Sequence, residues 1–533
     1  MVDEPASVAA GVEWFDRGTY TIDPIHPPLP RILIGLPLYL FGERYPEFAA
    51  DDPHGHNYND VGNSVLYGDA HYLRNLTLAR IGVLPFFLVA GILTFLWARD
   101  EFGTLAAVMA VALFTTLPPI LAYSGLAYTD APAASIQFAT LYAFTKWLKD
   151  PGSLNTVLLG IALGLATLSN FTSLLFVPAA GLGILLCELF CDLHRKNTSL
   201  NLDRKVSRFV AIALIACFVV WGGYRFSFGH VRESMQLSLE SMPSFQHFPR
   251  FVGNVARHAI VQDYLVPAPA LARGLAIEWV QGKSVPPAYL LGETKSGGWW
   301  YFFPVAVAVK SPLAFLLLAG AGACGILWCF RREPWHTLAP LASAIAILLV
   351  TMPLRYDAGI RHILVIFPLL AIVAGKAAAK LLDIRQWAPA TRLVLAGLLI
   401  WQAVSGFQAR GDYLAYFNEL GGTDPSKILL TGCDLDCGQD LFRLSDDLRA
   451  RNIQHFSLAM WSSADVSKTD LPSFDVLQPF QPVSGWLAIS ARSRILGDVF
   501  HDTYPPGAFA WLAPYQPVEQ IGRTIRLYHI PRI

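Results

Sequence analysis

Residues 80–98 read RIGVLPFFLVAGILTFLWA, an apolar run that carries a single charge, Arg80, at its first position. A helix that spans the hydrocarbon core of a bilayer needs roughly 20 mostly apolar residues, so this run is long enough. Further runs of the same kind follow at approximately 104–122, 131–148, 154–170, 171–190, 207–223, 302–329, 337–353, 362–382 and 391–407. The sequence therefore predicts a mainly α-helical protein whose helices cross a membrane many times.

The composition agrees with a surface that largely faces lipid. Of the 533 residues, 54% are hydrophobic and 15% are charged, whereas about a quarter of the residues of a soluble domain are charged. The formal net charge is zero, which gives no reason to expect a nucleic-acid partner. The His and Cys residues show no zinc or haem spacing, and no cofactor is firmly implied.

Basic residues orient the predicted bundle. They gather in three links between the apolar runs, at 146–149, 195–208 and 331–332. With strict alternation of the spans, these links lie on one side, which the positive-inside rule makes cytoplasmic. The segments predicted to lie on the extracytoplasmic side are residues 1–79, the 224–299 loop and the tail after 407.

The pattern predicts three parts. Residues 1–79 form an outer loop with interfacial helices, because the 32–41 stretch is too short to span. Residues 80–407 form the transmembrane bundle, and 408–533 a small extracytoplasmic α/β domain. In this tail we expect an amphipathic helix at 440–451 and strands at 427–431, 455–460, 486–490 and 524–530. Because the chain opens on a polar stretch, we also expect a first transmembrane helix upstream of Met1.

Acidic residues mark two places on the predicted outer face. Asp3 and Glu4 are adjacent in the first outer loop and are followed by His26-Pro27-Pro28-Leu29, while Asp130 stands where the 131–148 helix begins. Each acid also has a structural interpretation. A solvated loop accounts for the first pair, and Asp130 suits the N-terminus of a helix.

Basic residues gather on the same face. Lys310 interrupts an apolar run, and Arg355, Arg361 and His362 lie in a short outer link. Outer links normally contain few Lys or Arg, so this cluster favours a phosphate ligand, whose oxygens Arg binds bidentately. For Lys310, a side chain that snorkels to the interface is the simpler alternative.

Acids and cations at a lipid–water boundary suit one reaction type. A sugar joined to a lipid phosphate already has a good leaving group. The enzyme must bind the phosphate with cations and remove a proton from the acceptor hydroxyl with a carboxylate base. Direct attack on the anomeric carbon would invert its configuration.

The order of the short motifs resembles a known family. The chain looks like the phospholipid-carrier-dependent glycosyltransferases of the GT-C type, which include the protein O-mannosyltransferases and the aminoarabinose transferases, in their bacterial branch. The markers are Asp3-Glu4, His26–Leu29, Arg80, Thr129-Asp130, Tyr289–Glu293, Gly297–Tyr301, Lys310–Leu313, Gly359–His362, Tyr413–Gly422 and Asp436–Asp440. The resemblance implies a helical membrane bundle with an outer active-site cavity. It also implies a polyprenyl-phosphate sugar donor and a glycan, lipid or protein acceptor.

The resemblance further implies roles for residues. Asp3 is the implied catalytic base, with Glu4 as its neighbour and Asp130 as a second acid. The residues implied for the lipid phosphate and the donor are Arg361, His362, Lys310, Arg80 and His26.

Two departures from the family pattern stand out. Asn170 lies where such sequences often carry Lys, so one implied cation is missing. Cys433 and Cys437 stand where the tail motif usually has Ser and Trp. We therefore hypothesise a disulfide between them in an oxidising compartment.

The rival interpretation is a flippase for lipid-linked sugars or another multi-pass transporter. Transporters commonly place charged residues near the bilayer midplane, between repeated halves. Here the charged residues lie at helix ends and no repeat is visible, which favours an enzyme of the inner or plasma membrane. The identity of the sugar and of the acceptor stays open, as does the use of Mg²⁺ or Mn²⁺.

Overall fold

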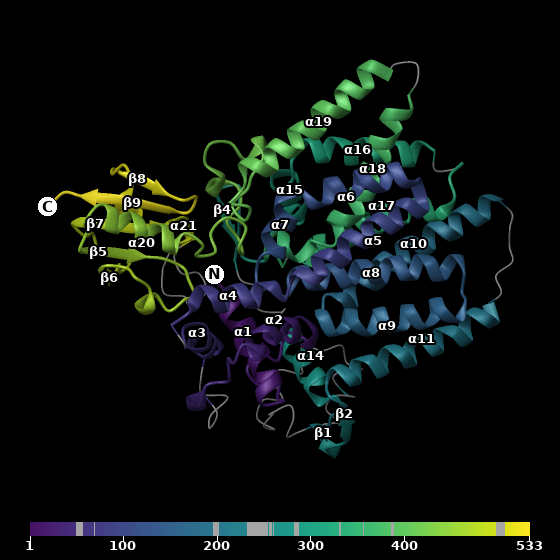
Figure 1. The fold of residues 1–533 in the computed structure, drawn as a ribbon, viewed down its shortest axis with the longest axis horizontal. Helices are drawn as coiled ribbons and strands as arrows, with labels where there is room; N and C mark the ends of the chain where they lie inside the picture. Colours follow the sequence, from purple (N-terminus) through teal and green to yellow (C-terminus); the bar gives the residue numbers. More distant parts are fainter. Residues whose placement is uncertain are drawn as a thin grey trace.

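The computed structural model describes residues 1–49, 57–68, 70–195, 202–231, 254, 258, 261–281, 287–329, 332–354, 356–384, 388–496 and 507–532. Its helices are α1 (Glu4–Asp16), α2 (Pro28–Leu40), α3 (Tyr58–Tyr67), α4 (Tyr72–Ile81), α5 (Leu84–Phe102), α6 (Thr104–Thr115), α7 (Pro118–Ser124), α8 (Asp130–Lys149), α9 (Ser153–Ser169), α10 (Ser173–Arg195), α11 (Leu202–Gly223), α14 (Pro269–Gln281), α15 (Phe302–Lys310), α16 (Leu313–Trp328), α17 (Trp335–Thr351), α18 (Ile366–Asp383), α19 (Ala388–Gln408), α20 (Leu441–Ala450) and α21 (Ala491–Leu496). The predicted fold class, mainly α with a bundle of long helices, is confirmed (Figure 1).

Several of these helices suit a bilayer. Among the described residues, four stretches are long and apolar enough to cross a membrane: Tyr72–Phe102, Ser173–Cys191, Trp335–Leu354 and Ala388–Gln408. Two bent helix pairs raise the number to six if each pair is one span. The chain is thus an integral membrane protein, as its hydropathy predicted.

The span predicted over 302–329 is not one straight helix. It divides into α15 and α16, which meet at an angle of 119°. Pro312 is the physical reason, because proline disfavours the helical conformation of the residue before it. Ser311 accordingly has extended backbone angles, and Asn418 donates to its carbonyl. The prediction failed here because hydropathy reports polarity, not the path of the backbone.

Small residues let the central helix α18 approach its neighbours closely. A Cβ atom at Gly375 would lie 2.5 Å from the carbonyl oxygen of Ala106 on α6. At Gly322 on α16, it would lie 2.1 Å from the carbonyl oxygen of Val373. Such glycines are typical of helix contacts in membranes, where packing replaces the hydrophobic effect.

The tail folds around a five-stranded sheet of order β6-β5-β7-β9-β8. The short strands outside it are β1 (Phe228–His230) with β2 (Leu265–Pro267), and β3 (Ala288–Leu290) with β4 (Glu293–Lys295). The sheet strands are β5 (His455–Ala459), β6 (Ser473–Val476), β7 (Gly485–Ser490), β8 (Glu519–Ile521) and β9 (Ile525–Ile530). β5 pairs in parallel with β6 and β7, whereas β9 pairs antiparallel with β7 and β8.

Most of the predicted tail elements match this sheet. The strands expected at 455–460, 486–490 and 524–530 correspond to β5, β7 and β9, and the helix at 440–451 to α20. The strand expected at 427–431 is wrong, because this segment makes only an isolated bridge between Leu429 and Leu290. The edge strands β6 and β8 were not predicted, since they are short and lack a clear alternation of buried side chains.

The segments predicted to share one face lie together at one end of the bundle (Figure 1). The backbone N–H of Val2 donates to the carbonyl of Cys437 in the tail. The guanidinium of Arg225, which follows α11, lies 4.0 Å from the ring of Trp14 on α1. Lys196 and Arg331, which contributed to the orientation, lie outside the described residues, and so does Arg355.

The contact between α1 and α3 leads to a prediction. A Cβ at Gly62 would lie 1.9 Å from the carbonyl oxygen of Pro5, and overpacking a tight contact costs about 1–3 kcal/mol. Gly62→Ala should therefore lower the melting temperature of the purified protein in detergent, measured by intrinsic fluorescence. Gly91→Ala on α5 is the matched control, because none of the described residues has an atom within 4 Å of the added Cβ. Equal melting temperatures for both variants would contradict the packing described here.

Candidate functional site

Arg361 lies between two carboxylates at this end of the bundle. Its Nη1 atom is 2.8 Å from Oδ2 of Asp3 and 3.8 Å from Oδ2 of Asp130. Asp3 directly precedes α1, Asp130 begins α8, and Arg361 belongs to the 3₁₀ turn η4 (Ile360–Ile363). The side chain of Asp3 is 46% exposed and that of Asp130 is 10% exposed. Asp3 is thus the acid that a substrate reaches more easily.

The local backbone presents both acids to the site. Asp3 adopts a left-handed conformation, with φ of 68°, and its side chain does not cap α1. Aspartate tolerates this conformation better than most residues. Thr129 occupies the N-cap position of α8, and Asp130 lies in the first turn, where its charge suits the positive end of the helix dipole as the structural alternative expected. Both carboxylates are thereby left to face Arg361.

Asp434 holds the turn that carries Arg361. Its Oδ1 atom accepts a hydrogen bond of 2.9 Å from the N–H of Ile360. Gly359 has φ of 103°, and a Cβ there would lie 3.0 Å from the Asp434 carboxylate. Burial raises the pKa of the Asp434 carboxyl to about 6, although Lys310 and the Ile360 N–H oppose the shift. The sequence offered no signal for this residue, which acts only through tertiary contacts.

Lys310 does not face Asp3 and Arg361 directly. Its ammonium is buried and donates to the carbonyls of Leu414, at 2.7 Å, and Asp434, at 2.5 Å. It also lies 4.4 Å from the ring centroid of Phe417. These contacts join α15 to the tail. Because the ammonium is buried and does not reach the interface, the snorkelling alternative does not hold. Its implied contact with the donor stays a prediction.

Glu4 points away from Asp3 into the protein. Its fully buried carboxylate accepts two hydrogen bonds from Arg80, of 2.8 and 2.9 Å, and one from the N–H of Ala127. Burial acts to raise the pKa of Glu4, but the Met1 ammonium and Arg80 outweigh it and hold the pKa below its ordinary value. Arg80 lies in the last turn of α4, not at the start of a helix as predicted. The pair joins α1 to α4, and its implied roles in the site stay predictions.

His26 lies on a braced link between α1 and α2. Its Nδ1 atom is 2.9 Å from Oδ2 of Asp23, and its side chain is 38% exposed. The buried guanidinium of Arg31 donates to the backbone carbonyls of Asp23 and His26. Burial acts to lower the pKa of His26, but Asp23 outweighs it and raises the pKa. Sequence reasoning missed Asp23 and Arg31, although both flank the His-Pro-Pro motif.

His362 and Arg361 each keep one unpaired nitrogen. Within the described part of the chain, Nε2 of His362 and Nε of Arg361 are buried and have no hydrogen-bond partner. The ring of His362 packs edge-on against Tyr356, with centroids 5.5 Å apart. A buried polar atom without a partner costs free energy, so this region has spare capacity to bind a polar ligand.

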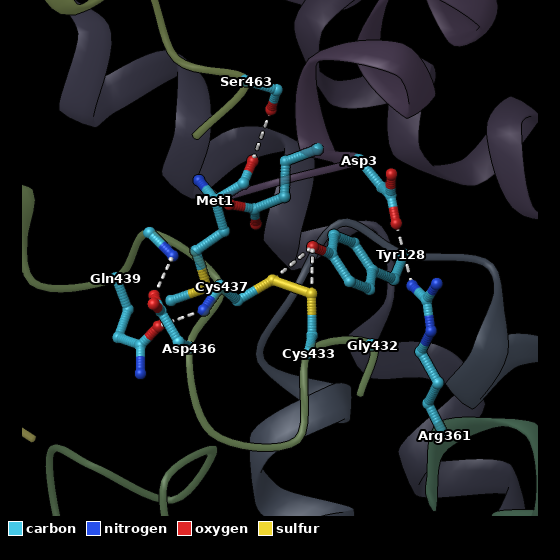
Figure 2. The surroundings of a disulfide bond; sticks show 12 residues. Met1, Asp3, Tyr128, Arg361, Gly432, Cys433, Asp436, Cys437, Gln439 and Ser463 are labelled. Atoms are coloured by element: carbon cyan, nitrogen blue, oxygen red, sulfur yellow. Dashed lines mark hydrogen bonds and ion pairs between the residues drawn. A yellow bond between two sulfur atoms is a disulfide. The ribbon is translucent and has the colours of Figure 1, made fainter. Parts of the chain in front are cut away.

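The disulfide lies against the hydroxyl of Tyr128, whose ring lies beside the guanidinium of Arg361 (Figure 2). Cys433 and Cys437 are bonded, with a Cα–Cα distance of 4.8 Å, which lies within the usual range. The hydroxyl of Tyr128 is 3.1 Å from Sγ of Cys437 and 3.6 Å from Sγ of Cys433. The guanidinium carbon of Arg361 lies 5.7 Å from the centroid of the Tyr128 ring. Tyr128 was not identified from the sequence as a residue of this site.

The acids of the tail motif are structural. Asp436 accepts a hydrogen bond from the N–H of Arg492, and Asp440 accepts from the N–H and hydroxyl of Thr524. They connect the loop around the disulfide to the sheet. Among the residues that the structure describes, no group of three or more His, Cys, Asp or Glu side chains is arranged to hold a metal ion.

The two adjacent acids should respond differently to loss of charge. Removing one partner of a buried ion pair costs about 3–5 kcal/mol, whereas an exposed pair contributes at most about 1 kcal/mol. Glu4→Gln should therefore lower the melting temperature strongly, and Asp3→Asn, the matched control, only slightly. A Glu4→Gln protein as stable as the parent would rule out this division of roles.

The disulfide can be tested by mass. The chain has seven cysteines, and the five outside this disulfide carry thiol groups, namely Cys187, Cys191, Cys217, Cys324 and Cys329. Alkylation of the denatured, unreduced protein should add five labels in an intact-mass measurement, and prior reduction should raise the number to seven. Seven labels without reductant would disprove the bond.

Residues 74–228 match the family model of dolichyl-phosphate-mannose-protein mannosyltransferase, and no curated protein matches the chain. The solved ArnT from Cupriavidus metallidurans bound to undecaprenyl phosphate is 14% identical, with a TM-score of 0.43, over 99% of this chain and 93% of that chain. The archaeal oligosaccharyltransferase AglB from Archaeoglobus fulgidus, in complex with an inhibitory peptide and a dolichol-phosphate, is 15% identical, with a TM-score of 0.44, over 92% of this chain and 65% of that chain.

The family match covers α5 to α11 and includes the Thr129-Asp130 motif. It is independent of the short motifs in residues 1–73 and in the tail, which point to the same group. The match over residues 74–228 agrees with the resemblance of the short motifs to the phospholipid-carrier-dependent glycosyltransferases of the GT-C type.

Proposed function

We propose that this protein transfers a sugar from a polyprenyl-phosphate donor to an acceptor hydroxyl at the extracytoplasmic face of the membrane. The observation that carries the proposal is the position of Arg361, held between Asp3 and Asp130 at one end of a bundle of membrane helices. A guanidinium binds phosphate oxygens, and a carboxylate beside it can accept a proton. The name of the matched family contains a donor of this class, dolichyl-phosphate-mannose.

The ion pair between Asp3 and Arg361 gives the proposed reaction an order. A donor phosphate competes with Asp3 for the guanidinium, so donor binding frees the Asp3 carboxylate. Asp130 keeps Arg361 turned toward the site during this exchange. The base therefore becomes available only when the donor phosphate is in place.

The proposed step is a single displacement. The acceptor oxygen attacks the anomeric carbon and transfers its proton to Asp3. The bond between that carbon and the phosphate oxygen breaks, and the lipid phosphate leaves with the electron pair, bound by Arg361. Attack opposite the leaving group inverts the configuration. His26, whose pKa Asp23 raises, adds positive charge for the same phosphate.

The alternative function is a flippase for lipid-linked sugars. A flippase needs a path for the headgroup across the bilayer, and charged residues along such a path lie near the midplane. The cluster of Asp3, Asp130 and Arg361 instead gathers where the N-terminal helix meets the tail. This placement supports chemistry at the membrane surface.

Asp3→Asn should lower kcat by about 10²–10⁴-fold, because an amide cannot accept the proton. Binding of undecaprenyl phosphate should be unchanged or tighter, since Arg361 loses a competitor. Consumption of polyprenyl-phosphate sugars by the purified protein, followed by mass spectrometry, measures the rate. The matched control is Asp475→Asn in the tail, where the carboxylate is 77% exposed.

Arg361→Ala should chiefly weaken binding of the donor lipid, whereas Asp3→Asn chiefly lowers kcat. Loss of a charged hydrogen-bond donor should weaken undecaprenyl phosphate binding by about 10- to 100-fold, while Arg449→Ala on α20 leaves it unchanged. Near-parental turnover by Asp3→Asn would remove Asp3 from the base role. A protein that moves the lipid across vesicles but consumes no sugar would be a flippase.

A further inference from the structure

A polar pocket lies between α3 and the loop that follows β5. Its volume is about 680 Å³, within the range of roughly 300–1,000 Å³ of small-molecule sites. One wall consists of α3 side chains that include Asn59, Asp60 and Asn63. The other wall is the 462–468 loop, with Ser462 and Lys468. The proposed reaction as described so far makes no use of this pocket.

Two amide oxygens of the α3 wall, those of Asn59 and Asn63, are buried. Asn63 is 5% exposed. Its Nδ2 donates to the carbonyl of Ser463, at 2.7 Å, which fixes the orientation of the amide. Among the described residues, nothing donates to Oδ1 of Asn63 or to Oδ1 of Asn59, although both atoms are buried. An unsatisfied buried acceptor is costly, so this wall calls for a ligand that brings hydrogen-bond donors.

The charges at the pocket disfavour an anionic ligand. The one lysine among the lining residues, Lys468, lies 3.5 Å from the carboxylate of Asp465 and 5.7 Å from the ring of Tyr67. Asp60 adds a further carboxylate on the α3 wall. A phosphate would meet acceptors here, whereas a sugar hydroxyl can donate to each of them. Amide, carboxylate and hydroxyl groups on both walls fit a neutral sugar better than the apolar side chains of a peptide.

The pocket adjoins the segment that carries the proposed base. The hydroxyl of Ser463 donates to the carbonyl of Met1, at 3.1 Å, and Figure 2 shows Ser463 beside Met1, with Asp3 in the same region. Asp3 is two residues from Met1, so their Cα atoms are at most roughly 7 Å apart. A chain of sugars that starts in the pocket can therefore extend toward Asp3 and Arg361.

We propose that this pocket binds a neutral sugar unit of the acceptor, so that the acceptor of the reaction is a glycan. The amide oxygens of Asn59 and Asn63 accept hydrogen bonds from its hydroxyls. A neighbouring sugar of the same chain then presents its hydroxyl to Asp3. This inference rests on the proposed function, and it names the class of acceptor.

The test uses the full-length protein in detergent. It is exposed to an array of neutral glycans and, as the competing class, an array of peptides that contain Ser and Thr. The dissociation constant of the best glycan is then measured for the parent, Asn59→Ala and Asn63→Ala. Asn155→Ala, on α9 beside a predicted cytoplasmic link, is the matched control. Binding of undecaprenyl phosphate is measured in parallel for every variant.

We expect a glycan to bind the parent and the control equally. Asn59→Ala should bind it about 5- to 10-fold more weakly, as expected for one lost hydrogen bond, with unchanged binding of undecaprenyl phosphate. Because Asn63→Ala also loses the bond to Ser463, Asn59→Ala decides the case if that variant does not fold. Binding of peptides instead of glycans, the absence of any glycan ligand, or equal glycan affinity of Asn59→Ala and the parent would overturn the inference. A parent that does not bind undecaprenyl phosphate would overturn the proposed function instead.

Discussion

The candidate site depends on one ion pair, between Asp3 and Arg361. The two residues are separated by more than 350 positions in the chain, yet their side chains lie 2.8 Å apart. The two carboxylates compensate the charge of a guanidinium that is largely shielded from water. The arrangement therefore requires α1, the start of α8 and η4 to meet at one point. Other contacts at this end of the molecule hold these three segments together.

Buried charged groups supply the support, one in an ion pair and two through hydrogen bonds to the backbone. Glu4 and Arg80 connect α1 to α4, and Lys310 connects α15 to the backbone of the tail. Asp434 holds the turn before α18. In each case a buried charged group makes hydrogen bonds that compensate for the loss of water: Glu4 and Asp434 accept them and Lys310 donates them. The acidic pair at the N-terminus thereby separates into an outward acid, Asp3, and an inward one, Glu4.

The tail completes the site as well as covering it. The loop of the Cys433–Cys437 disulfide contacts Tyr128 and the backbone of Val2, and the loop after β5 contacts Met1. The position of the Tyr128 ring beside Arg361 and the polar pocket near Asp3 both depend on these loops. This explains physically why the tail motif accompanies the membrane part: the sheet positions loops that the helices alone could not present.

The sequence by itself determined the elements whose signal is local. Runs of apolar residues predicted the membrane helices, and shorter apolar runs in the tail predicted β5, β7 and β9. Acids and cations in the predicted outer loops and links identified Asp3, Asp130 and Arg361 as candidates. It did not predict the bend at Pro312, the absence of a strand at 427–431, or the inward orientation of Lys310. Nor did it reveal the roles of Asp23, Tyr128 and Asp434. These roles depend on which distant segment of the chain packs against each residue, and hydropathy and motif spacing contain no information about such contacts. Only tertiary packing decides whether a carboxylate meets a cation, a backbone N–H or water, because an ion pair is a property of two places in the chain at once.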